Sequence, residues 1–269
     1  MKFETRIDRR FKELRARREK GFIAYVTAGD PSLRDTVDIV RGLADAGADV
    51  VELGIPFSDP LADGRVNQDA AARALARGAT LDGVLKCVAA IRRHSQVPML
   101  FFSYLNPVIA RGFEGTVRRT AEAGIDGFLV LDLPVEESER HRRALEKHRL
   151  NNIGLVTPTS TPERVERIVR ASSGFVYCVS REGVTGMQKK LAGTATELVR
   201  RTKRFTSLPV ALGFGISTPS QAAAAAAAAD AVIVGSAIVD RLAKAGRSAA
   251  GRARVFAWVG RLVRAVKQV

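Results

Sequence analysis

Two carboxylic acids, Glu52 and Asp63, have the residue types and the spacing that acid–base chemistry needs. Glu52 lies within residues 50–55, a short apolar run typical of a strand buried on both faces. A carboxylate buried there costs several kcal/mol unless it has a partner or a function. Asp63 follows beyond a loop that contains Pro and Gly. This pair suits general acid–base catalysis; the alternative is a satisfied core acid and a helix N-cap.

Glycines follow two later apolar runs of the chain. One run ends in Gly213 and Gly215, and the other ends in Gly235 followed by Ser236. Glycine lets backbone N–H groups approach an anion, and a helix that begins behind Ser236 would add a favourable dipole. Phosphate groups often bind after the seventh and eighth strands of a barrel, so we expect a phosphate site here.

A long connection begins at Ser180 and includes Gly183 and Gly186. About seventeen residues precede the helix that begins near Thr196, which is long for such a connection. We expect a lid that closes over the site, with a plain surface loop as the alternative.

Other polar residues stand at or near the ends of predicted strands. Tyr104, Asn106, Asp132 and Tyr177 would converge on the same end of a barrel as Glu52. We favour a role for Asp132 in holding loop backbone, because Pro134 follows almost at once and needs a fixed turn.

The remaining reactive side chains indicate no metal site. His94, His141 and His148 fall on predicted helices or at their ends, and we expect them at the surface. The two cysteines, Cys87 and Cys178, lie far apart and predict reduced core thiols in a cytoplasmic protein. No nucleophile elbow, P-loop or strand-interior lysine suggests covalent catalysis.

Strand and helix patterns alternate along the chain. The expected strands are residues 21–27, 49–55, 98–104, 127–133, 152–156, 174–179, 209–214 and 230–235. The expected helices are residues 32–46, 69–77, 81–94, 115–123, 136–148, 162–171, 194–203 and 218–229. Eight such units without a linker predict one α/β domain over residues 1–269, a (β/α)8 TIM barrel. Amphipathic helices in residues 1–20 and 255–269 would pack on it.

The net charge of +15 is concentrated at the two ends of the chain. Residues 1–20 hold nine Lys or Arg and four Asp or Glu, and residues 241–269 hold eight Lys or Arg and no acid, so residues 21–240 carry only +2. We interpret the basic ends as solvated helix faces. Binding to an acidic partner or nucleic acid is the alternative, disfavoured because no aromatic residues are interleaved there. No run of about 18 apolar residues predicts a membrane span.

The acid-bearing loop closely resembles the signature of the tryptophan synthase α subunit family. That segment is Glu52-Leu-Gly-Ile-Pro-Phe-Ser-Asp-Pro-Leu-Ala-Asp63-Gly, and it is highly specific. The similarity continues nearly end to end, through Tyr25-Val-Thr-Ala-Gly-Asp-Pro31, Tyr104-Leu-Asn-Pro107, Leu131-Asp-Leu-Pro-Val-Glu-Glu-Ser138, Gly183-Val-Thr-Gly186, Gly213-Phe-Gly-Ile-Ser217 and Gly235-Ser-Ala-Ile238. The last two motifs are shared more widely among phosphate-binding barrels.

The resemblance implies a lyase of tryptophan biosynthesis that cleaves indole-3-glycerol phosphate to indole and glyceraldehyde 3-phosphate by a retro-aldol reaction. Glu52 would deliver a proton to the indole ring carbon and take one from the glycerol hydroxyl. Asp63 would accept the indole N–H. The implied substrate-binding residues are Tyr25 and Tyr104, Tyr177 beside Glu52, Leu129 and Phe214 around the indole, Thr185 facing Asp63, and Gly186, Gly215, Gly235 and Ser236 around the phosphate.

The resemblance also implies a β subunit as partner in an α2β2 heterotetramer, with indole passed between the subunits. No cofactor is expected in this chain, and pyridoxal phosphate only in the β subunit. One departure is Arg65, where the family usually has Pro; it gives the loop more freedom, and it could pair with an acid on the partner or with Asp63. The other is the basic ends, which we expect to lie away from the site.

Three alternatives stay open at this point. The chain could be a free-standing lyase for the same substrate without a β partner. It could be a different phosphate-binding barrel enzyme, such as a sugar-phosphate isomerase or aldolase. It could also bind nucleic acid through its basic termini, the least favoured of the three.

Overall fold

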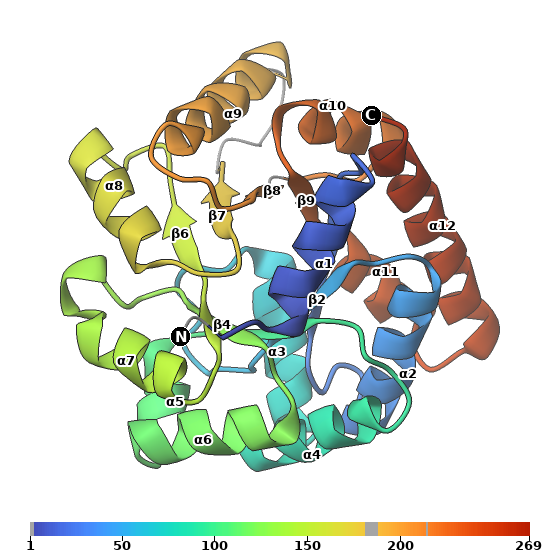
Figure 1. Cartoon of the computed structure of the whole chain (residues 1–269). Helices are drawn as coiled ribbons and strands as arrows, with labels where there is room; N and C mark the ends of the chain where they lie inside the picture. Colours follow the sequence, from blue (N-terminus) through green and yellow to red (C-terminus); the bar gives the residue numbers. More distant parts are fainter. Residues whose placement is uncertain (1–2, 181–187, 214) are drawn as a thin grey trace.

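A computed structural model describes residues 3–180, 188–213 and 215–269 of the chain. The described strands are all parallel and follow the order β5-β4-β3-β2-β1-β9-β8-β7-β6 (Figure 1). Their bounds are β1 Gly21–Thr27, β2 Val50–Gly54, β3 Met99–Ser103, β4 Gly127–Val130, β5 Asn151–Asn152, β6 Gly154–Val156, β7 Val176–Val179, β8 Val210–Gly213 and β9 Ala231–Val234. The two strands at the ends of this order, β5 and β6, are consecutive in the chain, so the sheet curls into the expected barrel.

Helices surround this barrel (Figure 1). They are α1 Arg6–Ala16, α2 Leu33–Asp45, α3 Arg65–Ala76, α4 Leu81–Arg92, α5 Leu105–Ile109, α6 Phe113–Ala123, α7 Glu139–Lys147, α8 Pro162–Ala171, α9 Gln188–Lys203, α10 Pro219–Ala228, α11 Ser236–Ala245 and α12 Ala249–Lys267, with a 3-10 turn η1 at Val135–Glu137. The sequence did not predict α5. It also placed the start of α3 four residues late and the start of α12 six residues late.

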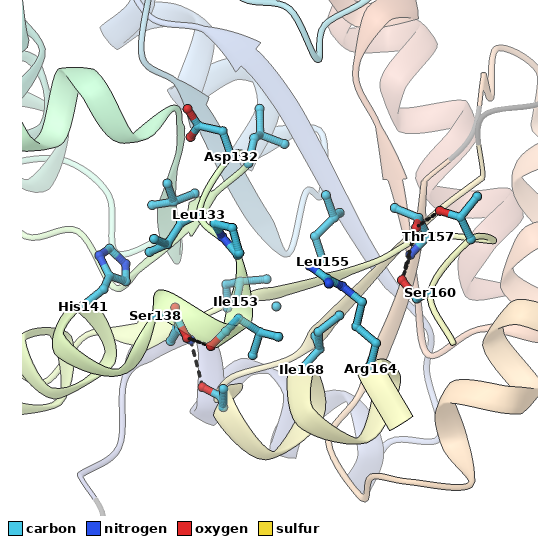
Figure 2. Close-up of a pocket in the computed structure, with 18 residues that line it drawn as sticks. Asp132, Leu133, Ser138, His141, Ile153, Leu155, Thr157, Ser160, Arg164 and Ile168 are labelled. Carbon is cyan, nitrogen blue, oxygen red and sulfur yellow. Dashed lines mark hydrogen bonds between the residues drawn. The ribbon is translucent and has the colours of Figure 1, made fainter. Parts of the chain in front are cut away.

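The predicted strand at 152–156 is wrong as a single element. Its first residues pair with β4 and its last residues pair with β7, and Ile153 separates β5 from β6. Figure 2 shows Ile153 and Leu155 on this part of the wall. The amide of Ile153 still donates to the carbonyl oxygen of Phe128 at 2.8 Å, so the barrel is joined there by one hydrogen bond and by the chain itself.

Both faces of the strands are buried, as the apolar runs predicted. The outward residues pack against the helices in one large cluster. The inward residues form a second cluster inside the barrel. This cluster includes Ile7, Phe11 and Leu14 of α1. A Cβ atom on Gly21, the first residue of β1, would lie 3.3 Å from Leu14. Helix α1 therefore covers the end of the barrel where the strands begin, as expected (Figure 1).

Three aspartates directly precede strands, and the carboxylate of each accepts a hydrogen bond from a backbone N–H of the neighbouring strand in the sheet. Asp49 accepts from the backbone N–H of Phe22 at 2.6 Å, Asp126 from that of Met99 at 2.9 Å, and Asp230 from that of Val210 at 2.9 Å. Each carboxylate also pairs with cations. These are Arg10 and Lys267 for Asp49, Arg6 and Arg92 for Asp126, and Lys203 for Asp230.

These contacts change the interpretation of the basic ends. Arg6 and Arg10 belong to α1 and Lys267 to α12, so part of the terminal charge neutralises buried aspartates instead of facing solvent alone. Asp35, which is 5% exposed, likewise pairs with Arg252 at 2.7 Å.

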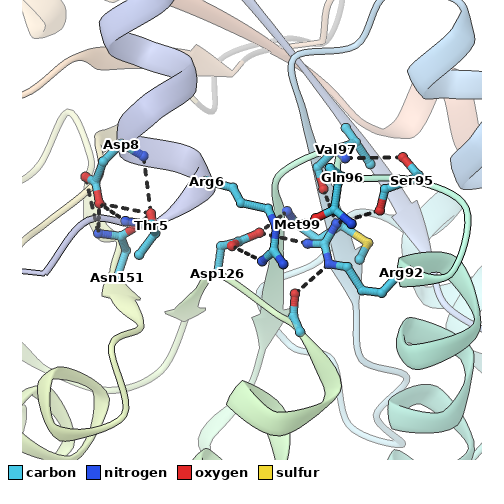
Figure 3. Close-up of polar contacts among 11 residues, drawn as sticks. Thr5, Arg6, Asp8, Arg92, Ser95, Gln96, Val97, Met99, Asp126 and Asn151 are labelled. Carbon is cyan, nitrogen blue, oxygen red and sulfur yellow. Dashed lines mark hydrogen bonds and ion pairs between the residues drawn. The ribbon is translucent and has the colours of Figure 1, made fainter.

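Replacing Asp126 should destabilise the fold strongly. Asp126 is 3% exposed and holds Arg92, whose side chain is 10% exposed and whose pKa burial lowers to about 10 (Figure 3). Asp126→Asn would keep an acceptor for Met99 but leave the buried guanidinium without its counter-charge. We expect a loss of about 3 kcal/mol in the free energy of unfolding, measured by urea denaturation.

The matched control is Asp82→Asn. Asp82 also pairs with two arginines, Arg111 and Arg119, but its side chain is 36% exposed. Water compensates for the lost pair at such a position, so this loss should be much smaller. Equal losses in the two variants would contradict the role given to Asp126.

Candidate active site

Glu52 lies on the inner face of the barrel. Glu52 is 0% exposed, and it pairs in register with Tyr25 on β1 and with Leu100 on β3. Neither carboxyl oxygen has a hydrogen-bond partner among the described residues. Burial raises the pKa of Glu52 to about 8. The side chain is therefore a neutral acid at neutral pH that can give up a proton and recover it.

Two tyrosines lean over glycines of the neighbouring strands beside Glu52. A Cβ on Gly54 would lie 2.2 Å from the Tyr25 hydroxyl, and one on Gly213 would lie 2.5 Å from the Tyr177 hydroxyl. A side chain at either position would push the ring aside, so glycine is required there. Burial raises the pKa of both tyrosines, and the charges of Glu52 and Asp63 raise it further. The two tyrosines and the two acids therefore share one site.

Asp63 is held at this site by Tyr104. The Tyr104 hydroxyl donates to Asp63 Oδ2 at 3.0 Å and accepts from the backbone N–H of Ala62 at 2.9 Å. The Phe57 ring packs on Tyr104 with the ring centroids 5.3 Å apart. One side chain from the end of β3 thus fixes the loop that carries the second acid.

Helix α3 begins at Arg65, two residues after Asp63. Its N-cap is Gly64, so the alternative in which Asp63 is an N-cap is wrong. Arg65 occupies the first helical position, where Pro is favoured, and pairs with Asp69 at 2.9 Å. The backbone therefore keeps the conformation of a Gly-Pro step without the proline.

Arg65→Pro should therefore stabilise the chain relative to Arg65→Ala. Both variants lose the exposed ion pair with Asp69. Gly64 has φ −77° and ψ 161°, an extended conformation that a following proline accepts. Fixing φ at residue 65 should add about 0.4–1 kcal/mol by restricting the unfolded chain. Denaturant midpoints of the two variants measure this, and a less stable proline variant would contradict it.

The glycines predicted to bind phosphate lie at strand ends on the same side of the barrel. Gly213 ends β8, and Gly215 has a left-handed φ of +28° with open space where a Cβ would point. Gly235 is the N-cap of α11, which begins at Ser236. The N–H groups of a first helical turn have no acceptor within the helix, so they can bind an anion.

Three predicted site residues, Thr185, Gly186 and Phe214, lie outside the described residues, and so do residues 181–187 of the predicted lid. The expected length of that connection is wrong, because α9 already begins at Gln188. Leu129 lies inside the barrel in the same cluster as Tyr177. The sequence missed the inward residues Phe102, Leu131, Leu155 and Val179, which pack against this cluster. The period of two along β3, β4, β6 and β7 would have identified them.

Two further predictions can be checked. Asp132 holds loop backbone as expected, because its Oδ1 accepts from the N–H of Leu105 at 2.7 Å. The surface position of His141 is wrong: this residue is 4% exposed and packs between Phe113 and Phe128. It lies four residues before the buried Leu145 on α7, so one helix turn brings both to the inner face. His94 is exposed as expected, and His148 is half-buried.

Both cysteines are buried free thiols, as predicted. In the described part of the chain, no group of three or more His, Cys, Asp or Glu side chains could hold a metal ion. Within the same residues, every helix is too short or too polar to cross a membrane.

Comparison with known proteins gives one consistent result. A family profile described as "Tryptophan synthase alpha chain" matches residues 11–267. A tryptophan synthase alpha chain of Caulobacter vibrioides is 47% identical over 245 residues, covering 91% of this chain and 89% of its own length. That of Carboxydothermus hydrogenoformans is 44% identical over 265 residues, covering 98% and 99%.

The solved structures agree with the sequences. The crystal structure of tryptophan synthase subunit alpha from Legionella pneumophila str. Paris superposes with a TM-score of 0.92 at 36% identity, covering 99% of this chain and 100% of that one.

Proposed function

The chain belongs to the tryptophan synthase alpha chain family, and from this premise we propose that Glu52 and Asp63 carry out its acid–base chemistry. The chain is a lyase that cleaves indole-3-glycerol phosphate to indole and glyceraldehyde 3-phosphate. The observation that carries the proposal is the Glu52 carboxyl, buried and without a hydrogen-bond partner among the described residues, beside a loop acid.

In the first step, Glu52 gives its proton to the indole carbon that bears the glycerol chain. That carbon becomes tetrahedral and the ring nitrogen becomes positively charged. The raised pKa of Glu52 keeps its proton available at neutral pH. Asp63 accepts the ring N–H and stabilises the positive charge. The Tyr104 hydroxyl donates to Asp63 Oδ2 and so holds this carboxylate in place at the site.

In the second step, the Glu52 carboxylate takes the proton of the adjacent glycerol hydroxyl. The bond between the ring carbon and the side chain breaks, its electron pair returns to the indole, and the hydroxyl carbon becomes the aldehyde. A buried carboxylate is a strong base, so burial favours this transfer. Glu52 ends the cycle protonated.

The phosphate group would be held at the ends of β8 and β9, next to β1, by backbone N–H groups of Gly215, Gly235 and Ser236. Support comes from the positive φ of Gly215 and from the start of α11, a helix of ten residues. The indole would then lie between Leu129 and Tyr177, in contact with both acids.

We propose a β subunit as the partner, in an α2β2 assembly. Leu61 in the Asp63 loop is 80% exposed, and Ile109 at the end of α5 is 44% exposed, so apolar surface is available near the mouth. We further propose that residues 1–269 act as one cytoplasmic domain without a cofactor of its own, with pyridoxal phosphate in the β subunit.

The test combines turnover with assembly. Purified chain is incubated with indole-3-glycerol phosphate, with and without a tryptophan synthase β subunit, and indole release and native mass are recorded. We expect slow release alone, faster release in the mixture, and a mass equal to two of each chain. Equal rates with no complex would favour the free-standing lyase. No indole release in either case would contradict the proposed function.

A further inference from the structure

A hollow lies between β4 and β6, beside the candidate active site. It measures about 510 Å³, and we refer to it as the β4–β6 hollow. Its walls come from the end of β4 and the following loop, from residues 152–160, and from α7 and α8 (Figure 2). Neither Glu52 nor Asp63, nor any of the glycines assigned to phosphate, lines it. Its volume lies within the usual range for small-molecule sites.

The break in the fifth strand produces this hollow. Strand β5 pairs with β4 only at Gly127 and Phe128, and β6 pairs with β7. Among the described residues, the last backbone hydrogen bond across the gap is the one from Ile153 to Phe128. Beyond it, Val130 at the end of β4 and Leu155 in β6 both line the hollow. The hollow therefore lies where pairing between β4 and β6 is interrupted.

Most polar side chains around the hollow already have partners. Asp132 at the rim binds the Leu105 amide, Ser138 donates to the Val135 carbonyl at 2.8 Å, and Ser160 accepts from the Thr157 amide at 3.1 Å. His141 is the exception. Although only 4% exposed, it has no hydrogen-bond partner at either ring nitrogen among the described residues. Such a buried group without a partner points to a ligand or a bound water.

His141 is uncharged at neutral pH, because burial lowers its pKa to about 4. A neutral imidazole offers one donor and one acceptor. The positive charge of the hollow comes instead from Arg164 on α8, at the other side from His141, with its guanidinium directed toward Leu155 (Figure 2). Among the described residues, Arg164 pairs only with Glu136, and that ion pair is long at 3.3 Å and exposed. The guanidinium is thus free to turn to a stronger partner.

We propose that the β4–β6 hollow binds an aromatic carboxylate. Leu131, Leu133 and Leu155 supply apolar walls for a flat ring, and Arg164 supplies a charged fork for the carboxylate. His141 supplies a hydrogen bond at the far end. Leu131 and Leu155 also pack against the barrel-interior cluster that contains Leu129 and Tyr177, so the hollow adjoins the candidate active site, but neither Glu52 nor Asp63 lines it.

The test uses 2-naphthoate as the probe, titrated calorimetrically into the intact chain. We expect saturable binding to the wild type, and binding at least about tenfold weaker to Arg164→Met. The matched control is Arg167→Met, because Arg167 also pairs with Glu136, at 3.5 Å, but does not line the hollow. It should bind like the wild type. The uncharged 2-naphthamide should bind weakly and equally to both arginine variants.

His141→Phe adds a second arm, since it keeps a ring of similar shape and removes both nitrogens. Its affinity for 2-naphthoate should fall several-fold, while Glu52→Gln should bind like the wild type, because Glu52 does not line the hollow. Circular dichroism confirms that each variant is folded. Absence of binding up to about 10 mM, equal loss in the two arginine variants, or loss in Glu52→Gln would overturn the proposal.

Discussion

Glu52→Gln is expected to lower kcat/KM for indole release by about 10³-fold. The amide has nearly the shape of the carboxyl group, but it can neither deliver a proton to the ring carbon nor take one from the hydroxyl. The residue is 0% exposed, so bulk solvent has no direct access to take its place. Steady-state release of indole from indole-3-glycerol phosphate measures the loss.

The matched control is Glu122→Gln on α6, where the same change falls on an exposed side chain paired with Arg118. Its kcat/KM should stay at the wild-type value. Wild-type activity in Glu52→Gln would remove the central claim about this residue. Similar losses in both variants would point to general damage instead.

The same substitution should alter how stability depends on pH. The pKa of Glu52 is about 8 in the folded chain, against the ordinary value of 4.5 that applies to the unfolded chain. Between pH 4.5 and about pH 8 the folded state therefore binds more protons than the unfolded state. Wild-type stability should therefore fall as pH rises through this window. Gln does not titrate, so Glu52→Gln should gain stability relative to the wild type from about pH 5 to about pH 8. A constant difference in urea midpoint would contradict this.

The second large effect is expected for Asp63→Asn, with a loss of about 10²-fold in kcat/KM. An amide cannot supply the negative charge that stabilises a positively charged ring, although it can still accept from Tyr104. The loss should fall mainly on kcat, because the charge develops only during the reaction. Initial rates over a range of substrate concentrations separate kcat from KM.

Two further variants sharpen this test. Asp59→Asn changes an exposed carboxylate in the same loop and should leave kcat unchanged. Tyr104→Phe removes the hydroxyl that holds Asp63 and Ala62, so it should raise KM more than it lowers kcat. If Asp59→Asn lost as much activity as Asp63→Asn, the effect would come from loop charge and not from a specific contact.

The sequence predicted the barrel and most of the candidate site because both depend on local patterns. The strand at residues 21–27 was predicted at its observed bounds, since seven buried residues there are followed by turn residues. Glu52 could be singled out because a carboxylate interrupts an apolar run, and the candidate phosphate glycines because they follow two such runs. Asp132 was assigned to loop support from the proline that follows it, and the structure confirms that role.

Other features depended on contacts between distant residues. Helix α5 contains Pro107, which argues against a helix in any local analysis. The division of the fifth strand follows from pairing with two different neighbours, which one short apolar run cannot indicate. The terminal arginines looked solvated because their partners, Asp49 and Asp126, lie far away in sequence. His141 was misplaced because charged neighbours on α7 outweighed its helical spacing to Leu145.

The paired aspartates have a practical consequence for handling the protein. Arg6 near the first residue binds Asp126, and Lys267 near the last residue binds Asp49 and Glu19, so both chain ends are anchored where the strands begin. The two acids open on the opposite side. An affinity tag, a fluorophore or a surface tether could be attached at either terminus and would leave the end of the barrel that carries Glu52 and Asp63 unobstructed.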